Sequence, residues 1–356
     1  MKIRLGDLTR IKTGKLDANA SSSDGEYPFF TCSKEPLKIA TYSYDCECVL
    51  VAGNGDLNVK YYNGKFDAYQ RTYIIEGNDD GKLYIPYLYF FMEKYVEELR
   101  KLSIGGVIKY IKLGNLTDAM IELPDMEKQK FIVRLLSKLK GIITQRRQQL
   151  QKLDELVKAR FVELFGDPIS NPMKWNICQL DECLERIDNG KSFICSDKPR
   201  IGDNPAILKL SAATYGDYRP NENKALLDES LFVESSEVHA GDLLFTRKNT
   251  PELVGTAAYV QNTPPKLMMP DLIFRLVPNE KVNAVFLWQL INCKKFRPVI
   301  QAISGGSAKS MSNISKERLG KIKVICPPRE LQDSLIPFVE QTDKSKVVVQ
   351  DEVNGL

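Results

Sequence analysis

The thiols and the single imidazole are the first side chains to weigh as nucleophiles or metal ligands. The chain has eight cysteines and one histidine, His239. A lone histidine leaves no second imidazole for a two-histidine metal site and at most one cysteine–histidine or serine–histidine pair. Cys46 and Cys48 would share one face of a strand, but no second pair stands at ligand spacing. We therefore expect no metal site and reduced thiols throughout.

Motifs for ATP use or methyl transfer are also missing. No G-x-x-x-x-G-K-S/T loop occurs, so ATP-driven work is not expected. Pro264-Pro265 and Pro327-Pro328 lack the preceding asparagine and following aromatic residue of the adenine methyltransferase tetrapeptide. We predict no catalytic residue in this chain. A site built only of acidic and basic side chains would leave no such motif, so a diverged autonomous methyltransferase or nuclease stays an alternative.

Composition is that of an ordinary soluble protein with room for about two domains. Of 356 residues, 43% are hydrophobic and 27% charged, and the net charge is +4. No uninterrupted apolar run reaches the ~18 residues of a membrane span, and the charged N-terminus is no signal peptide, so we expect a cytoplasmic protein without membrane contact. The positive charge is concentrated in residues 124–166, which carry 10 basic and 5 acidic side chains. A solvated helix face explains this excess without any partner.

One long helix is predicted over residues 124–166. Asp125 can cap its start, and Gly166 followed by Pro168 can end it. Apolar residues recur with a heptad period from Leu136, which favours packing against another helix or a partner protein. The predicted interface consists of Ile132, Leu135, Leu136, Leu139, Ile143, Leu150, Leu153, Val157 and Leu164.

The segments on either side of this helix repeat one another. LTRIKTGK at 8–15 aligns with LERIDNGK at 184–191, and Gly105-Gly106-x-x-Lys109 aligns with Gly305-Gly306-x-x-Lys309. Leu116, Pro124 and Gln129 align with Leu319, Pro327 and Gln332. Ordered anchors of this kind indicate a duplication. We predict mixed α/β (α+β) domains at 1–123 and 167–326, each followed by a helix, with the second helix at 327–356 short and broken by Pro337.

This layout resembles the specificity subunits of type I restriction–modification systems, and the resemblance covers essentially the whole chain. LQKLDELVKARFVELFGDP at 150–168 is similar to the central conserved helix of that family, and PPRELQDSLIPFVEQTDKSK at 327–346 to its second conserved region. GKFDAYQRTYII at 64–75, GDLLFTRKNTPELVGTAAYV at 241–260 and DLIFRL at 271–276 are similar to its target-recognition domains.

The resemblance implies a non-catalytic subunit in which each recognition domain reads one half of a bipartite, asymmetric double-stranded DNA target. The two helices would pair as an antiparallel coiled coil that sets the spacing. Modification subunits, which carry S-adenosylmethionine and methylate adenine, would dock on these helices, and a restriction subunit would join for cleavage. No cofactor is expected in this chain. Because the second helix is short, segment 131–143 is expected to self-associate or to contact the modification subunit. A coiled-coil adaptor whose globular domains bind protein is the remaining alternative.

Reading DNA requires cations or backbone N–H groups for phosphates, and forked or two-ended side chains for base edges. Given the resemblance, the candidates in the first copy are Asn54, Gln70, Arg71, Lys109, Tyr110 and Lys112. Those in the second copy are Arg247, Lys248, Asn249, Lys309, Ser310 and Asn313. The glycine pairs before Lys109 and Lys309 would let backbone approach a phosphate closely.

Overall fold

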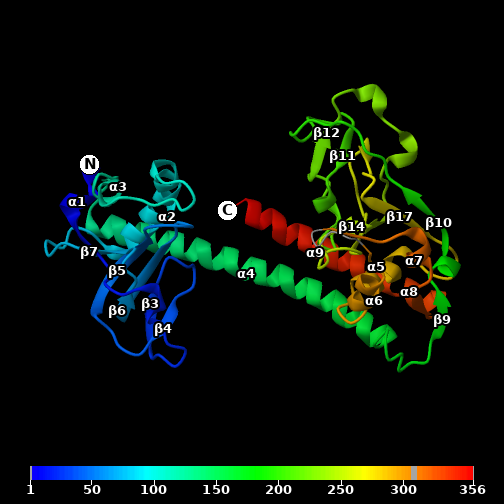
Figure 1. Ribbon diagram of the computed structural model, residues 1–356, viewed down its shortest axis with the longest axis horizontal. Coiled ribbons are helices and arrows are strands. Elements are labelled where there is room, and N and C mark those ends of the chain that lie inside the picture. Colours follow the sequence, from blue (N-terminus) through cyan, green and yellow to red (C-terminus); the bar gives the residue numbers. More distant parts are fainter. Residues whose placement is uncertain (1, 306–310, 356) are drawn as a thin grey trace. The chain divides into compact units, whose positions relative to one another are not determined.

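The computed structural model describes residues 2–305 and 311–355 and divides into two compact units, Met1–Gln145 and Arg146–Leu356 (Figure 1). Helix α4, Met126–Phe165, contributes its first half to unit one and its second half to unit two. Both units combine sheets with helices, which confirms the predicted mixed α/β class. No helix in the described ranges is long and apolar enough to cross a membrane.

Unit one is built on a six-stranded sheet in the order β2-β7-β5-β6-β3-β4, with β1 and β8 paired beside it. Its elements are β1 (Lys2–Arg4), α1 (Leu5–Leu8), β2 (Thr9–Thr13), β3 (Tyr27–Phe30), β4 (Leu37–Ile39), β5 (Tyr44–Ala52), β6 (Val59–Ala68), β7 (Thr72–Gly77), α2 (Ile85–Leu102), α3 (Leu113–Thr117) and β8 (Met120–Glu122).

The central strand β5 is covered on both faces, which explains its unbroken apolar run. Val49 and Val51 point to a core shared with α2, whereas Cys48 and Leu50 point to a second cluster around Phe66. Successive side chains of a strand alternate between faces, so both registers of β5 must be apolar. The α2 side chains that complete the first core recur at helical spacing: Leu88, Met92, Val96 and Leu99.

Unit two contains a four-stranded sheet in the order β10-β17-β13-β15 and a three-stranded sheet in the order β12-β11-β16. Its elements are β9 (Asn176–Gln179), β10 (Leu184–Asn189), β11 (Ala206–Leu208), β12 (Asn223–Ala225), β13 (Leu243–Thr246), β14 (Lys248–Asn249), β15 (Ala257–Tyr259), β16 (Leu267–Met268), β17 (Ile273–Pro278), α5 (Ala284–Asn292), α6 (Arg297–Ala302), β18 (Ser312–Asn313), α7 (Lys316–Gly320), β19 (Lys323–Cys326), α8 (Arg329–Asp333) and α9 (Leu335–Asn354).

The sheets confirm the duplication. The order β2-β7-β5-β6 of unit one recurs as β10-β17-β13-β15 in unit two. The backbone N–H of Asn78 donates to the Leu8 carbonyl (2.9 Å), and that of Asn279 donates to Cys183 (3.0 Å), so Leu8 corresponds to Cys183. The sequence alignment had paired Leu8 with Leu184. A register shift between Leu184 and Arg186 supplies the extra residue.

A glycine follows strand β2 in unit one and strand β10 in unit two, at a point where two backbones touch. A Cβ added to Gly14 would lie 2.1 Å from the Ala68 carbonyl oxygen, and one added to Gly190 would lie 2.0 Å from that of Pro270. No side chain fits at such a distance, so the close approach of two strands explains why both repeats have glycine at this position.

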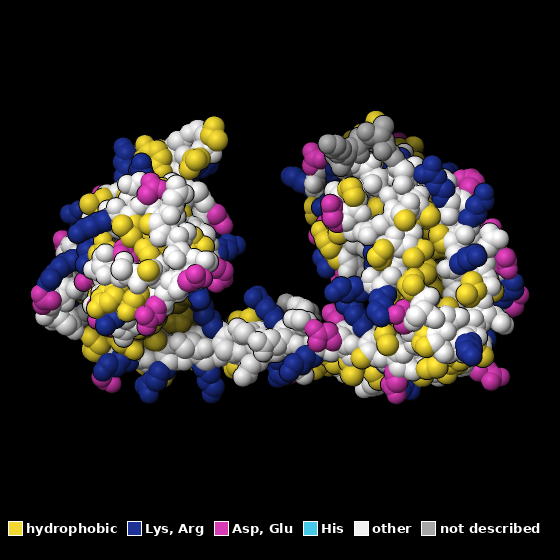
Figure 2. Space-filling model, turned by 60° about the horizontal axis from the view of Figure 1, so that its bottom comes forward, with side chains coloured by type: hydrophobic (Ala, Val, Ile, Leu, Met, Phe, Trp, Pro, Cys, Tyr) yellow, Lys and Arg dark blue, Asp and Glu magenta, His cyan; other side chains and the backbone are white. Residues whose placement is uncertain are grey.

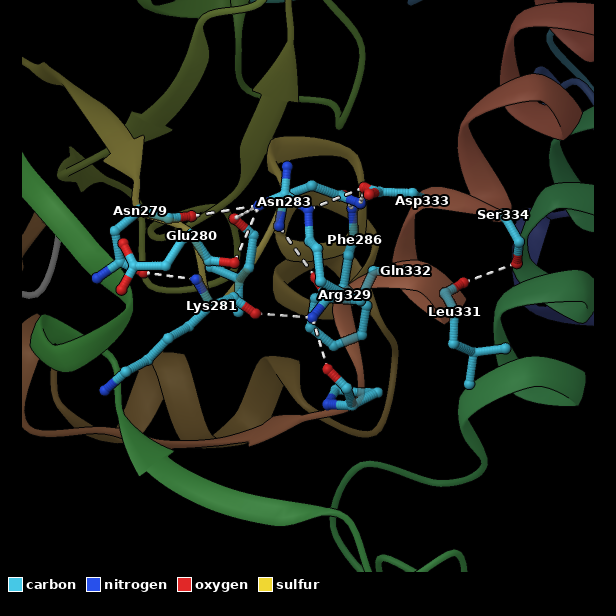
Figure 3. A network of polar contacts seen from close by, with 12 residues as sticks. Asn279, Glu280, Lys281, Asn283, Phe286, Arg329, Leu331, Gln332, Asp333 and Ser334 are labelled. Atoms are coloured by element: carbon cyan, nitrogen blue, oxygen red, sulfur yellow. Dashed lines mark hydrogen bonds and ion pairs between the residues drawn. The ribbon is translucent and has the colours of Figure 1, made fainter.

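A buried glutamine fastens the helix that follows each copy. Gln332 is fully buried; its Oε1 accepts from the Asn283 N–H (3.0 Å), and its Nε2 donates to the Lys281 and Pro327 carbonyls at 2.9 and 2.8 Å (Figure 3). Gln129 is equally buried and makes the matching three bonds to Tyr84, Lys82 and Pro124. These bonds account for the alignment of the two prolines and two glutamines.

The helix predictions hold at both ends of α4. The Asp125 carboxylate accepts from the Lys128 N–H at 2.8 Å, and Gly166 has a φ of 74°. The second helix is interrupted, but at Ser334 and not at Pro337 as predicted: α8 ends at Asp333 and α9 begins at Leu335. Pro337 therefore lies in the first turn of α9, where its missing N–H costs no helical hydrogen bond.

Within unit two, α9 runs antiparallel to the second half of α4. Arg146 pairs with Glu352 (2.8 Å) and Asp154 with Lys346 (2.6 Å), so numbers rise on one helix as they fall on the other. The Arg160 guanidinium lies over the Phe338 ring in the same sense. Residues of α4 and α9 thus contact one another in the antiparallel sense that the family resemblance implies, although a coiled-coil geometry itself stays a prediction. In Figure 2, Lys and Arg side chains are interspersed with acidic, apolar and other side chains along the exposed part of α4.

Candidate nucleic-acid interface

Two turns and one loop meet at the end of the unit-one sheet. The Gly53 N–H donates to the Arg71 carbonyl (2.8 Å), the Ile111 N–H to Gly53 (2.9 Å) and the Gly55 N–H to Lys109 (2.9 Å). A cavity of about 100 Å³ opens there, lined by Thr13, Gly53, Gln70, Arg71, Tyr73 and Ile111. We call residues 53–55, 70–71 and 104–112 the first loop cluster. It gathers the six candidates that the sequence places in the first copy.

The candidate side chains of this cluster are largely free to meet a ligand. Gln70, Arg71, Lys109 and Lys112 are exposed, Tyr110 is 38% exposed and Asn54 is half-buried. Within residues 2–305 and 311–355, the side chains of Gln70, Arg71 and Lys109 have no hydrogen-bond or ion-pair partner. The Lys112 backbone N–H is bonded to Asn115 Oδ1 at the start of α3 (2.7 Å). Cations and amides without internal partners suit phosphates and base edges.

The tip of this loop also carries an apolar pair that the sequence analysis missed. Val107 is fully exposed and Ile108 is 62% exposed. They follow Gly105, whose φ is 116°. An exposed apolar pair next to a free lysine resembles the wedges that some DNA-binding proteins insert between base steps. The sequence does show that these two apolar residues directly follow a glycine pair, and this position could have indicated an exposed loop tip.

Unit two builds the same frame at the equivalent place. The Arg247 N–H donates to the Leu272 carbonyl (3.0 Å), and the Ile314 N–H donates to Arg247 (2.8 Å). Strand β14 pairs with β18 through Lys248–Asn313 and Asn249–Ser312. We call residues 247–249, 271–272, 305 and 311–314 the second loop cluster. It gathers Arg247, Lys248, Asn249 and Asn313, whereas Lys309 and Ser310 lie outside the described residues.

The side chains of the second cluster have more internal contacts than those of the first. The Arg247 guanidinium lies 4.9 Å from the Phe274 ring centre and donates to Asn313 Oδ1 at 3.4 Å. Lys248 Nζ is 3.8 Å from an Asp271 carboxylate oxygen. These contacts hold Arg247 and Asn313 as a joined pair at the surface.

Asn249 has a different environment from the other candidates. It is only 7% exposed; its Nδ2 donates to Thr214 Oγ1 (3.2 Å) and its Oδ1 accepts from the Thr250 N–H (2.9 Å). Both ends of the amide are therefore used inside the protein. These bonds hold the turn that presents Arg247, and a contact of Asn249 with a base stays a prediction.

The hydrogen bonds also fix which residues of the two clusters correspond. The Gly53 N–H donates to Arg71 as the Arg247 N–H donates to Leu272. Gly53 therefore corresponds to Arg247, and Arg71 corresponds to Leu272. The bridge between Ile104 and Tyr110 matches that between Gly305 and Asn313. Ile104 rather than Gly105 is thus the counterpart of Gly305, which shifts the sequence alignment by one residue. The two copies thus share one backbone hydrogen-bond pattern, which we call the frame, but have their Arg and Lys side chains at different positions in it.

A polar cavity in unit two, in which arginines are paired with carboxylates, was not predicted. A cavity of about 530 Å³ is lined by Arg186, Ile187, Asp188, Asn189, Ser235, Arg275 and Lys316. Arg275 pairs with Asp242 at 2.9 Å, and burial raises the pKa of Asp242 despite this guanidinium. The three cations come from β10, β17 and α7, which the sequence alone does not bring together.

The predicted interface stripe of α4 is divided between cores and solvent. Val157 is buried with Phe161 and Phe165 in the core of unit two. Leu135 is 49% exposed, and Phe131, one turn earlier and absent from the prediction, is 57% exposed. The remaining predicted residues are half-buried: Ile132, Leu136, Leu139, Ile143, Leu150, Leu153 and Leu164.

Comparison with known proteins identifies the family. A model described as the type I restriction modification DNA specificity domain matches residues 1–154. The chain is 36% identical over 384 residues to the type I restriction enzyme EcoDI specificity subunit of Escherichia coli, covering 99% of this chain and 83% of the relative. It is 30% identical over 209 residues to the EcoEI specificity subunit of Escherichia coli, covering 57% of this chain and 35% of the relative.

The solved structures agree on the fold. The S subunit of a type I restriction–modification system from M. genitalium superposes with a TM-score of 0.64 at 14% identity, covering 100% of this chain and 92% of that one. The EcoDI relative, which matches 99% of this chain, favours a specificity subunit over a protein-binding adaptor or an autonomous methyltransferase or nuclease. The chain therefore belongs to the specificity subunits of type I restriction–modification systems, a family in which catalysis resides in other subunits.

Proposed function

We propose that this chain reads a bipartite DNA target through its two loop clusters, with 1–123 and 167–326 as target-recognition domains. The observation that carries this proposal is the repeated frame: in each copy, backbone hydrogen bonds hold polar side chains at the same end of the same sheet. Backbone hydrogen bonds do not depend on side-chain identity, so the loops keep their shape when their side chains change. A domain that recognises different DNA sequences in different proteins requires this property.

The two half-sites should differ. The first cluster presents Arg71 without an internal partner, whereas the second has Leu272 at that place and presents Arg247 joined to Asn313. An arginine fork matches guanine and an amide matches adenine. Different cations at different points of the frame imply an asymmetric target.

The partners follow from the family. Double-stranded DNA, modification subunits and a restriction subunit are the expected components of the complex, with S-adenosylmethionine held by the modification subunit. The target adenine would be flipped into that subunit's pocket, because enzymes acting on a base take it out of the stack.

The test is co-purification with a modification subunit, followed by mapping of methylated adenines across a genome. Arg71→Ala should relax one half-site and Arg247→Ala the other, each at a cost of ~1–3 kcal/mol in discrimination. Lys94→Ala, on the exposed side of α2, is the matched control and should leave the target unchanged. Relaxation of one and the same half-site by both arginine variants would refute the assignment, as would methylation by this chain alone.

The modification subunit should dock on the exposed apolar residues of α4. Phe131 and Leu135 lie one turn apart, and contiguous exposed apolar side chains commonly mark an interface. Phe131→Ser with Leu135→Ser should abolish co-purification, whereas Leu37→Ser, 43% exposed on β4, should not. The alternative occupant is a second copy of this chain, which light scattering on the chain alone would detect as a dimer. If the double variant converts that dimer to a monomer, the surface serves self-association instead.

A further inference from the structure

Three cysteines far apart in the sequence meet in unit two. The Sγ atoms of Cys178 on β9, Cys183 before β10 and Cys326 at the end of β19 all lie within 4.8 Å of one another. Cys183 and Cys326 are 3.4 Å apart. Cys183 is fully buried and the other two are half-buried. Among the described residues, no other group of three or more histidine, cysteine, aspartate or glutamate side chains has its ligand atoms this close together.

The first copy is an internal control for this cluster. Ile3 pairs with Ile121 in β1–β8 as Cys178 pairs with Val324 in β9–β19, and Leu8 occupies the place of Cys183. Leu123 precedes Pro124 as Cys326 precedes Pro327. Ile3, Leu8 and Leu123 all belong to the core of unit one. Three aliphatic positions have therefore all become thiols in the second copy.

Core packing alone does not account for this triple replacement. Each change from leucine or isoleucine to cysteine removes aliphatic volume, and large-to-small changes in a core cost stability. Here all three shortened side chains converge on one point. Three sulfurs around a point are the donor set that thiophilic d10 cations prefer, and structural zinc sites are built from such thiolates.

The dimensions fit a zinc ion. A Zn–S bond of ~2.3 Å places sulfurs of a tetrahedral site about 3.8 Å apart. The observed separations, 3.4 Å between the Cys183 and Cys326 sulfurs and at most 4.8 Å between any two of the three, bracket that value. Three thiolates and Zn²⁺ carry one net negative charge. Burial raises the pKa of the Cys178 thiol, and the neighbouring Cys183 thiol together with burial raises that of Cys326. The Lys281 ammonium, 3.9 Å from a Glu182 carboxylate oxygen, opposes both rises and would offset part of this charge.

We propose that Cys178, Cys183 and Cys326 form a three-thiolate site for Zn²⁺ in unit two, with a fourth position open to water. Binding replaces three S–H protons, which pass to solvent, by three Zn–S bonds, with no change of oxidation state. The ion would tie β9, which follows α4 in the chain, to β19, which leads into α8. Copy one has no counterpart because its three positions are aliphatic.

Zinc titration of the full reduced chain against a chromophoric chelator is the primary test. We expect one tight equivalent for the wild type. The variant carrying Cys178→Ile, Cys183→Leu and Cys326→Leu, which are the residues of copy one, should lose it. The loss should exceed the ~10–100-fold that removal of an outer supporting contact costs. The control carrying Cys32→Ser, Cys46→Ser and Cys293→Ser retains the cluster and should bind as the wild type does.

A second measurement keeps the proposal testable if the cluster variant fails to fold. Alkylation of the wild-type chain, mapped by mass spectrometry, should show Cys178 and Cys326 protected by Zn²⁺ and exposed again by a chelator. The proposal is overturned if the wild type binds no stoichiometric zinc, or if the cluster variant binds it equally well. A Cys183–Cys326 disulfide that forms in the metal-free chain and that zinc does not prevent would also overturn it, in favour of a redox pair.

Discussion

Replacing the buried amide of Gln332 tests how the second helix is attached to its domain. Gln332→Leu keeps the approximate size of the side chain and removes all three of its hydrogen bonds. The Asn283 N–H and the Pro327 carbonyl then stay buried without a partner, because both residues are buried in unit two. The Lys281 carbonyl belongs to an exposed residue and can turn to water.

The expected loss follows from this count. A buried polar group left without its partner costs ~1–3 kcal/mol, so two such groups predict a destabilisation of about 2–6 kcal/mol. With a urea m-value of ~1–3 kcal/mol/M, the midpoint of unit two should fall by roughly 1–2 M. This is a large part of the ~5–15 kcal/mol that stabilises a typical domain.

The two tryptophans provide a unit-specific assay. Trp175 and Trp288 both lie in unit two, so their fluorescence reports unfolding of that unit alone. Gln129→Leu removes the matching bonds in unit one and should lower a transition seen by far-ultraviolet circular dichroism while leaving the fluorescence midpoint in place. Gln148→Leu, exposed on α4, is the control for the leucine side chain. A fluorescence midpoint for Gln332→Leu within 0.3 M of the Gln148→Leu control, on the order of 1 kcal/mol or less, would refute this account.

Two further predictions concern a helix cap and an acid-sensitive carboxylate. Asp125→Ala removes the cap on the Lys128 N–H and should destabilise unit one by ~1 kcal/mol, measured by circular dichroism in urea, whereas Asp125→Asn should retain most of the stability. Burial alone would raise the pKa of Asp333, but hydrogen bonds from Asn283 and Arg329 hold it below its ordinary value. The stability from this carboxylate is therefore complete above the unfolded pKa of about 4 and is lost as the pH falls through the lower folded pKa. The fluorescence midpoint of Asp333→Asn should fall less than that of the wild type over this range, and equal slopes would contradict the assignment.

The sequence was sufficient for the features that depend on periodicity and local chemistry. Helix α4 begins and ends within two residues of its predicted limits because Asp125 and Gly166 act locally, through one side chain and one backbone angle. The duplication was visible because the buried Gln129 and Gln332 and the close-packed Gly14 and Gly190 allow few substitutions in their settings.

The features that the sequence did not predict depend on long-range contacts. Cys178 and Cys326 are 148 positions apart, and only the β9–β19 ladder brings their sulfurs together. The burial of Asn249 against Thr214 was not predicted because these two residues lie on different segments of the chain. The alignment of Leu8 was off by one because a strand irregularity has no marker in the sequence. Spacing patterns describe single elements, whereas these sites arise where several elements meet.

The close glycines explain how one frame supports two different reading surfaces. The strand ends at Gly14 and Gly190 touch backbone rather than side chains, so the positions of the turns do not depend on which side chains they present. Gly190→Ala would force a Cβ to 2.0 Å from the Pro270 carbonyl oxygen, and backbone would have to move. Overpacking of this kind costs ~1–3 kcal/mol or more. Gly141→Ala in α4 is the matched control, because its Cβ would meet nothing within 4 Å and should instead stabilise the helix by up to ~1 kcal/mol.

These glycine variants separate the frame from the reading side chains. Gly190→Ala should lower the fluorescence midpoint and weaken recognition of the half-site read by unit two at every base position, since the whole second loop cluster is displaced. Arg247→Ala should relax discrimination at the bases it contacts and cost about 1 kcal/mol of stability at most, because it loses a cation–π contact with Phe274 and long hydrogen bonds to Asn313. If Gly190→Ala proves neutral in urea, strand contact does not set the position of the cluster. If Arg247→Ala destabilises unit two as much as Gly190→Ala does, the arginine is part of the frame and not of the reading surface.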